Sequence, residues 1–386
     1  MSNSFPLVHN QSQDKLEEGI GLCLSGGGYR AMLFHLGTLW RLNKACYLPK
    51  LNRISSVSGG SIVSAQLGRC WNSLDFNEQG SATRFQELVV DPIRRLASKT
   101  IDARSVLGGV FLPGSVSDRV ERAYDKILFD GATLQDLPDS PRFVINATNV
   151  QSGVLWRFSK PYMWDYRVGK VVNPTVQLAS AVTASSAFPP FLSPYILELE
   201  PEDFEKNSGT DLQYEPFTTD VVLTDGGVYD NLGLETVYKR YRTVLVSDAG
   251  GESKPDPEPA SNWASHSLRV HWVTDRQVRS LRKRQLIQAF INSKGAQPPS
   301  DKNWRNGAYW GSYSNIANYE LPDALDCPFS QTQELANIET RLKRLPKGTQ
   351  ERLINWGFAV CDAAMRKHVD TTIGAPSGFP YPRGVG

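Results

Sequence analysis

Apolar residues in the first part of the chain form short β-type runs that alternate with longer stretches of helical spacing. Residues 20–24 are an apolar run typical of a buried strand, and 29–42 carry apolar residues at intervals that suit a helix packed on a sheet. A second β-prone run at 53–57 is followed, after a serine and two glycines, by another apolar helical pattern. Two strand–turn–helix units in succession predict an α/β fold with a parallel sheet.

The rest of the chain continues this alternation and then changes character. Helical patterns cover residues 84–99, 116–128 and 173–187, and strand patterns cover 142–147, 155–158, 221–224 and 244–247. The composition shifts to Pro, Asp and Glu at 254–259, which predicts the end of the sheet-bearing core. Two further helical patterns follow, a basic one at 275–293 and a longer one at 331–369 with a break near 346–348.

These patterns divide the chain into four parts. We expect a polar N-terminal tail at 1–18, an α/β domain at 19–253, a mainly helical C-terminal extension at 254–370 that packs on the core, and a Gly/Pro-rich tail at 371–386. A chain of 386 residues is long enough to bury a large core.

Composition narrows the classes of function. The chain is 40% hydrophobic and 21% charged, as in ordinary globular proteins, and its net charge of +2 gives no sign of a nucleic-acid partner. Its five cysteines lack metal-ligand spacing and are odd in number, which favours a reducing compartment over a disulfide framework. We find no signal-peptide pattern and no apolar run of roughly 20 residues. We therefore expect a cytoplasmic protein whose contact with a membrane, where it occurs, is peripheral.

A serine on a tight turn is the first candidate for chemistry. Ser58 follows the second β-prone run in the pattern Ser56-x-Ser58-x-Gly60, where a nucleophile elbow of the form Gly-x-Ser-x-Gly would have glycine in place of Ser56. Such a turn holds the serine Oγ at the sheet edge, and the following helix aims unpaired N–H groups at it. The same residues also suit a Ser/Gly turn without a catalytic role.

A glycine-rich turn precedes this serine by one strand–helix unit. Gly26, Gly27 and Gly28 connect the first strand pattern to the first helical pattern and are followed by Arg30. A dinucleotide site would require an acidic residue about twenty residues later, where this chain is basic, and a phosphate-binding P-loop would require a Lys-Ser/Thr pair, which is absent. An oxyanion hole needs the same backbone donors. A turn that serves only tight packing remains an alternative.

A serine nucleophile also needs a base. None of the histidines has the loop setting of a hydrolase triad (His9, His35, His266, His271 and His368). Asp225 ends a predicted strand, and Gly226 and Gly227 let the backbone turn close to it. Its carboxylate would need burial or a shared hydrogen bond to act as a base near neutral pH. Asp248, also at a strand end, is the second candidate base, and an Asp-Gly turn without chemistry is the alternative for Asp225.

The ordered set Gly-Gly-Gly-x-Arg, x-Ser-x-Gly-Gly and Asp-Gly-Gly resembles the patatin-like phospholipases, lipid acyl hydrolases that use a Ser–Asp dyad. The resemblance spans roughly 19–251. It implies a three-layer fold with a mainly parallel central sheet flanked by helices, and no cofactor or metal. It implies that Ser58 is the nucleophile, that Asp225 is its base, and that the N–H groups around 26–28 form the oxyanion hole. Arg30 matches the family's basic residue, which implies a role in positioning the substrate head group or in holding the loop.

The implied substrate is a phospholipid or a lysophospholipid. The chain departs from the family's glycines at Ser56 and Ala31, both of which are small. Two other functions stay open: a regulatory protein whose glycine turn binds a phosphate or a nucleotide signal, and an esterase with a Ser-His-Asp triad. The basic helical pattern at 275–293 suits either attraction to anionic lipid or a solvated helix face.

Overall fold

The computed structural model describes residues 16–102, 115–190, 192–252, 255–294 and 304–386. The strands are β1 (Glu17–Leu24), β2 (Arg53–Ser56), β3 (Arg142–Asn149), β4 (Val154–Phe158), β5 (Tyr162–Asp165), β6 (Gly169–Val172), β7 (Tyr195–Glu198), β8 (Asp220–Asp225), β9 (Tyr241–Asp248) and β10 (Asn306–Gly311). The helices are α1 (Gly28–Lys44), α2 (Gly59–Cys70), α3 (Asp91–Ala97), α4 (Ser115–Tyr124), α5 (Leu178–Ser185), α6 (Gly227–Asp230), α7 (Glu235–Tyr238), α8 (Trp263–Ser293), α9 (Phe329–Ala336) and α10 (Lys347–His368).

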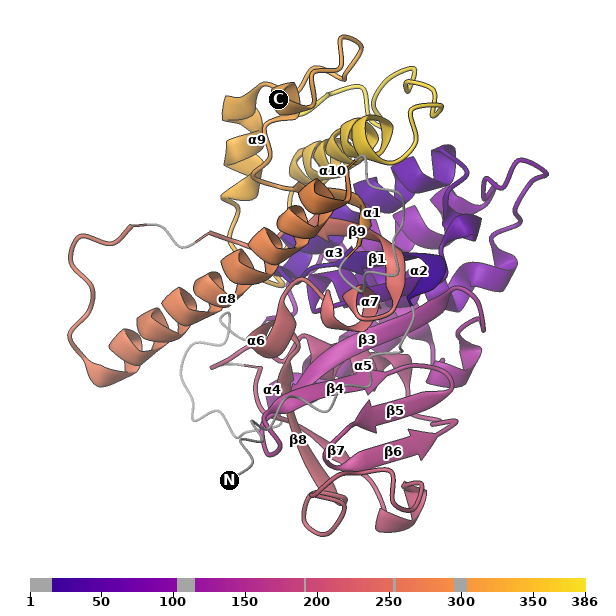
Figure 1. Cartoon of the computed structure of the whole chain (residues 1–386). Helices are drawn as coiled ribbons and strands as arrows, with labels where there is room; N and C mark the ends of the chain where they lie inside the picture. The colour runs from indigo at the N-terminus through magenta and orange to yellow at the C-terminus, as the bar shows by residue number, and fades with distance from the viewer. Residues whose placement is uncertain (1–15, 103–114, 191, 253–254, 295–303) are drawn as a thin grey trace, which may run out of the picture.

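Within these described residues the strands form one sheet in the order β10-β9-β1-β2-β3-β4-β5-β6, with β8 pairing with β3 and β7. The five central strands from β10 to β3 pair in parallel, and antiparallel strands extend the sheet beyond β3. Helices lie on both faces of the sheet (Figure 1). The predicted α/β fold, with a parallel central sheet flanked by helices, is therefore confirmed.

The two faces of the sheet have separate hydrophobic cores because successive strand residues point to opposite sides. Leu22 and Leu24 of β1 join the large core under α1, α2 and α10, whereas Cys23 packs with Val237 of α7 and Leu286 of α8 on the other face. This alternation explains the continuous apolar run of β1, which is covered on both sides.

Helix α1 is held in place by a close contact with α10. A Cβ on Gly37 would lie 2.0 Å from the Ile354 carbonyl oxygen, and a Cβ on Gly357 would lie 1.9 Å from that of Phe34. Only glycine permits the two helix backbones to approach so closely. Since the glycine-rich turn opens α1, the C-terminal helix α10 also fixes the position of that turn.

Two expectations about the C-terminal part are wrong. The sheet does not end before residues 254–259: α8 leads to β10, which pairs in parallel with β9. The sequence of β10 has glycine at two of its six positions, so its β pattern is weak. The helical pattern predicted for 331–369 is interrupted for longer than expected, because α9 ends at Ala336 and α10 begins at Lys347. No helix in the described part of the chain is long and apolar enough to cross a membrane.

Candidate active site

Ser58 lies on the turn between β2 and α2, at the carboxyl edge of the parallel strands. Its backbone has φ 51° and ψ −117°, a strained conformation for a residue other than glycine. Glycines make the turn feasible: a Cβ on Gly59 would lie 2.2 Å from the Gly28 carbonyl oxygen, and one on Gly60 would lie 2.4 Å from that of Leu24. The turn has the strained strand-to-helix form of a nucleophile elbow.

Small polar side chains support this turn. The Ser58 N–H donates to Ser185 Oγ at 2.9 Å, and the Ser185 hydroxyl donates to the Asn146 carbonyl at 2.7 Å. Ser61 Oγ lies 2.9 Å from Ser185 Oγ and 3.1 Å from Ser56 Oγ. Ser56, at the elbow's first glycine position, is fully buried and thus belongs to the same network. The contribution of Ser185 could not be predicted from the sequence, because this last residue of the small-residue helix α5 belongs to no recognisable motif.

Sheet register brings Asp225 beside Ser58. Ser56 of β2 is opposite Ile145 of β3, and Asp225 of β8 is opposite Ala147 of the same strand. The last residue of β8 therefore lies at the edge of the sheet where β2 ends and the turn with Ser58 begins. The Ser58 side chain lies close enough to the Asp225 carboxyl to lower its pKa.

The environment of Asp225 suits a base. Its side chain is 3% exposed, and burial raises its pKa from 3.8 to about 7. The Gly227 N–H, which donates to the carboxylate at 2.7 Å, and the nearby Ser58 side chain offset part of this rise in pKa, while the charge of Asp275 on α8 adds to it. The neighbouring Gly226 N–H donates to the Ser185 carbonyl at 3.3 Å, which anchors the turn. A carboxylate with a pKa near neutral can accept a proton at the pH of the cell.

Gly26, Gly27 and Gly28 form the turn between β1 and α1, directly beside the serine. A Cβ on Gly26 would lie 2.4 Å from Asn231 Oδ1 and 3.2 Å from Ser58 Cβ, and Gly27 and Gly28 have φ values of 145° and 60°. The Gly26 N–H donates to the Asn231 carbonyl at 3.1 Å, whereas no acceptor within the described residues binds the N–H of Gly27 or Gly28. Among the three glycines of this turn, Gly27 and Gly28 therefore keep an N–H that is open to a ligand.

Arg30 points away from solvent and is 2% exposed. Its guanidinium donates to the Ala249 carbonyl at 3.0 Å, to Thr340 Oγ1 at 3.0 Å and to the Ile338 carbonyl. Burial lowers its pKa to about 10, which leaves the side chain charged at neutral pH. Of the two roles expected for Arg30, these contacts favour holding the loop, because they join the glycine turn to the end of β9 and to a C-terminal segment.

That segment, residues 338–345, is called here the strap, and it lies over the glycine turn. The Tyr29 N–H donates to the Arg341 carbonyl at 3.0 Å, and a Cβ on Gly28 would lie 2.7–3.1 Å from the Arg341 backbone. Arg341 also pairs with Asp102 at 2.8 Å. The sequence carries no signal for this contact, since the strap falls within the region predicted as helical.

The described histidines do not join the Ser–Asp pair (His35, His266, His271 and His368). His35 is fully buried behind the glycine turn, where Nε2 lies 2.9 Å from the Ser25 carbonyl oxygen and Nδ1 lies 2.9 Å from Ser247 Oγ. Burial lowers its pKa to about 4, so it is neutral at pH 7. His9 lies outside the described residues. The geometry therefore gives no support to a Ser-His-Asp triad.

Asp248, the second candidate base, lies in another environment. Its carboxylate accepts hydrogen bonds from the Tyr309 hydroxyl at 2.7 Å and from the Gly250 N–H at 2.9 Å. Burial alone would raise its pKa, but the nearby Arg279 and these hydrogen bonds lower it below the ordinary value. A carboxylate so stabilised as an anion is a poor base, and the geometry favours Asp225.

In the described part of the chain, no group of His, Cys, Asp and Glu side chains is arranged to hold a metal ion.

Ser58 is 8% exposed, and helix α8 approaches the pair through Asp275, whose charge acts on Asp225. The ring of Trp272 on α8 packs on Phe188, with 5.2 Å between ring centroids, and Phe188 follows α5 closely in the chain. The amino-terminal half of α8 projects beyond the sheet (Figure 1). Its outward side exposes large apolar side chains, including Trp263 at 83% and Leu281 at 56%.

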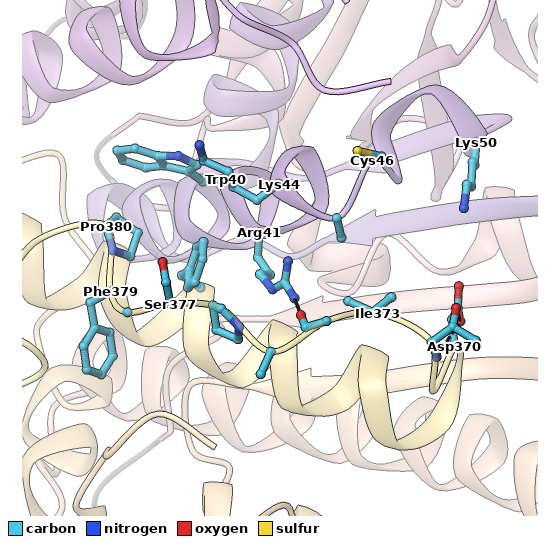
Figure 2. A pocket seen from close by; sticks show the side chains of 17 residues that line it. Trp40, Arg41, Lys44, Cys46, Lys50, Asp370, Ile373, Ser377, Phe379 and Pro380 are labelled. Carbon is cyan, nitrogen blue, oxygen red and sulfur yellow. Dashed lines mark hydrogen bonds between the residues drawn. The ribbon is translucent and has the colours of Figure 1, made fainter. Parts of the chain in front are cut away.

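The described part of the chain has two clefts that are lined by neither Ser58 nor Asp225. The first, of about 670 Å³, lies between the last turns of α1 and residues 370–380 (Figure 2). Arg41 crosses it and donates to the Gly374 carbonyl at 2.7 Å, so the C-terminal residues are fastened to α1. The second cleft, of about 730 Å³, lies at the carboxyl ends of β9 and β10.

Comparison with known proteins gives one family and several distant structures. The family model described as patatin-like phospholipase matches residues 22–238. Human GIVD cytosolic phospholipase A2 is 12% identical over 89% of this chain and 60% of its own, with a TM-score of 0.49. VipD from Legionella pneumophila is 16% identical over 83% of this chain and 66% of its own, with a TM-score of 0.31. No curated protein matches. The chain spans about 60% of the length of the human enzyme.

Proposed function

Because the chain belongs to the patatin-like phospholipase family, we propose that it hydrolyses carboxylic esters of phospholipids or lysophospholipids with Ser58 as the nucleophile. The observation that carries this proposal is the position of the Ser58 side chain beside the buried Asp225 carboxyl, where the register of β2, β3 and β8 brings them together. A serine on a strained turn, a base with a pKa of about 7 and free backbone donors are the three parts that acyl transfer requires. None of these parts needs a histidine or a cofactor.

In the first step, Asp225 takes the proton of the Ser58 hydroxyl while Oγ attacks the ester carbonyl carbon. The carbonyl oxygen becomes an oxyanion, which the N–H groups of Gly27 and Gly28 stabilise at the positive end of α1. The intermediate collapses as the C–O bond to the alcohol breaks. The leaving alkoxide takes the proton from Asp225, and an acyl-serine remains.

In the second step, water attacks the acyl-serine and gives a proton to Asp225. The same N–H groups stabilise the second oxyanion, and collapse of this intermediate breaks the bond to Ser58 Oγ. Oγ recovers its proton from Asp225, and the fatty acid leaves. Each step thus needs Asp225 unprotonated at its start, which matches a pKa close to neutral.

The residues around the pair have positioning roles in this proposal. Ser56 and Gly60 shape the elbow, while Gly226 and Gly227 shape the turn after the base. Arg30 holds the glycine turn against the strap, so its effect on the substrate is indirect. We also assign Gly26 to the shape of the oxyanion turn, because its own N–H is bound to the Asn231 carbonyl.

The proposed substrate places the protein at a lipid surface. The exposed apolar side of α8 and the arginines on the same helix suit peripheral contact with an anionic membrane. All five cysteines are free thiols, which is consistent with the cytoplasm as the compartment.

A fluorophosphonate probe tests the nucleophile. We expect the wild-type chain to form one covalent adduct on the tryptic peptide that contains Ser58 and to lose phospholipid hydrolysis in parallel. Ser58→Ala should abolish both, and Ser64→Ala, on the helix that follows Ser58, should retain the label. Full hydrolysis by a folded Ser58→Ala variant, or a label on another serine, would contradict the assignment.

A further inference from the structure

The cleft at the carboxyl ends of β9 and β10 is separate from the proposed catalytic pair, and no role has yet been given to it. Its volume of about 730 Å³ is within the range of small-molecule sites. Ligands of open α/β sheets commonly bind outside the carboxyl ends of the strands, which is where this cleft lies. Its walls come from α8, from the segments after β9 and β10, and from the ends of the C-terminal helices.

One wall carries a row of cations. Arg276, Arg279 and Lys283 occur at positions i, i+3 and i+7 of α8 and all line the cleft. Arg279 is held in place, because it donates to the Gly251 carbonyl at 2.8 Å and lies near the charge of Asp248. Lys283 Nζ lies 4.5 Å from the centre of the Tyr309 ring, and no carboxylate of the described chain pairs with it.

The carboxylates that line the cleft, Asp248 and Glu252, are fewer than the three cations of α8. Asp248 accepts hydrogen bonds from the Tyr309 hydroxyl and the Gly250 N–H, and the charges of Arg279 and Lys283 lower its pKa. At the far end, burial lowers the pKa of His368, and the charges of Lys294 and Lys367 lower it further, which indicates a positive potential there.

Neutral groups in the cleft add hydrogen-bonding capacity and ring surfaces. Asn315 uses its side-chain oxygen to cap the Ala317 N–H, so its amide N–H₂ remains a donor. Asn318 lines the same wall, and Tyr313 and Phe329 supply aromatic surface. Cations beside amide donors suit phosphate oxygens, and aromatic faces suit the organic part of a ligand.

We propose that this cleft binds the phosphate group of a small organic phosphate, with Arg276 and Lys283 as the principal charged contacts. The phosphate comes either from a soluble phosphate ester or from a phospholipid head group at a membrane. In both cases Arg276 and Lys283 would bind the phosphate group in the same way. The proposal does not depend on hydrolysis by Ser58, and it concerns a different place from the glycine turn.

Direct binding to the full-length protein tests the proposal. We would titrate inorganic phosphate and glycerol 3-phosphate by calorimetry, and vesicles with or without phosphatidic acid by co-sedimentation. The double variant Arg276→Gln/Lys283→Gln should weaken binding at least tenfold, since it removes two charge-assisted contacts. Lys44→Gln is the matched control, because Lys44 lines the other cleft (Figure 2) and should leave binding unchanged.

Each outcome decides the matter. Saturable binding of either soluble phosphate that the double variant loses supports a soluble ligand. Binding only to phosphatidic acid vesicles, lost in the same variant, supports a lipid head group. Binding that is equal in wild type and the double variant, or no binding to any of these probes, overturns the proposal. Because both replaced side chains are exposed, circular dichroism should show an intact fold, and Lys283→Glu provides a second variant.

Discussion

The Ser58 side chain lies beside the Asp225 carboxyl and lowers its pKa, although the two residues are separated by most of the α/β core in sequence. β3 mediates this contact, because it pairs in parallel with β2 and antiparallel with β8. The reversal of β8 brings its last residue to the edge at which β2 ends. The order and direction of the strands therefore bring the serine and the aspartate together, and no histidine from a loop is needed to complete the pair.

The first prediction concerns the pH dependence of hydrolysis. The proposed base works only when unprotonated, and burial raises the pKa of Asp225 to about 7. The value of kcat/KM should therefore fall about tenfold per pH unit below that pKa and should level off above it. A pH profile with a soluble ester substrate checks this. A profile that stays flat down to pH 5 would mean that Asp225 is not the base.

The second prediction concerns stability. Because the folded-state pKa of Asp225 is raised, the folded chain holds a proton between about pH 4 and pH 7 that the unfolded chain releases. This carboxyl therefore makes stability decrease as pH rises through that window. The shift from 3.8 to about 7 corresponds to about 4 kcal/mol above pH 7. Asp225→Asn should raise Tm by several degrees at pH 8, and by less than half of that at pH 5.

Asp362 provides the control for this stability measurement. It is as buried as Asp225 but pairs with Arg41 at 2.7 Å. Asp362→Asn should lower Tm at both pH values, because it leaves a buried cation without its partner. If Asp225→Asn lowers Tm at pH 8 as Asp362→Asn does, then the charged form of Asp225 is not costly in the fold.

The third prediction concerns the support of the elbow. Ser185 Oγ accepts the Ser58 N–H at 2.9 Å, so Ser185→Ala removes the partner that fixes the strained turn. We expect kcat to fall about tenfold or more with little change in KM, since a small displacement of a nucleophile is costly. Ser180→Ala is the control on the same helix, because the Ser180 hydroxyl bonds to Glu121 at 2.6 Å instead. Equal kcat values for the two variants would show that the Ser185 contact is dispensable.

The sequence predicted the fold class and the three segments that meet at the site, but not the contacts that position them. Glycine and aspartate at strand ends are local signals, so Gly26–Gly28, Ser58 and Asp225 were identifiable. The strap was not, because Arg341 reaches Tyr29 through a backbone carbonyl that any residue could supply. β10 was missed because its glycines weaken the β pattern and its pairing with β9 is a long-range property.

The fourth prediction separates two roles of Arg30. Its guanidinium binds the carbonyls of Ala249 and Ile338, and we propose that it holds the glycine turn. Arg30→Gln should then reduce kcat for a neutral ester and for a phospholipid by the same factor, about tenfold or more. It should also speed hydrogen exchange in the strap. A variant that raises KM for the phospholipid alone, with the strap still protected, would show direct contact with the head group.

The last prediction concerns membrane contact through α8. Trp263 and Leu281 are 83% and 56% exposed on its outward side, and burial of such side chains in the interface contributes about 1.5–3 kcal/mol each. Trp263→Ser with Leu281→Ser should weaken co-sedimentation with anionic vesicles at least tenfold and leave hydrolysis of a soluble ester unchanged. Ile196→Ser is the control, because Ile196 is 53% exposed on β7 instead. Replacing the arginines of α8 by glutamine should weaken binding further at low salt and less at high salt. Vesicle binding that is unchanged in these variants would exclude α8 as the membrane contact.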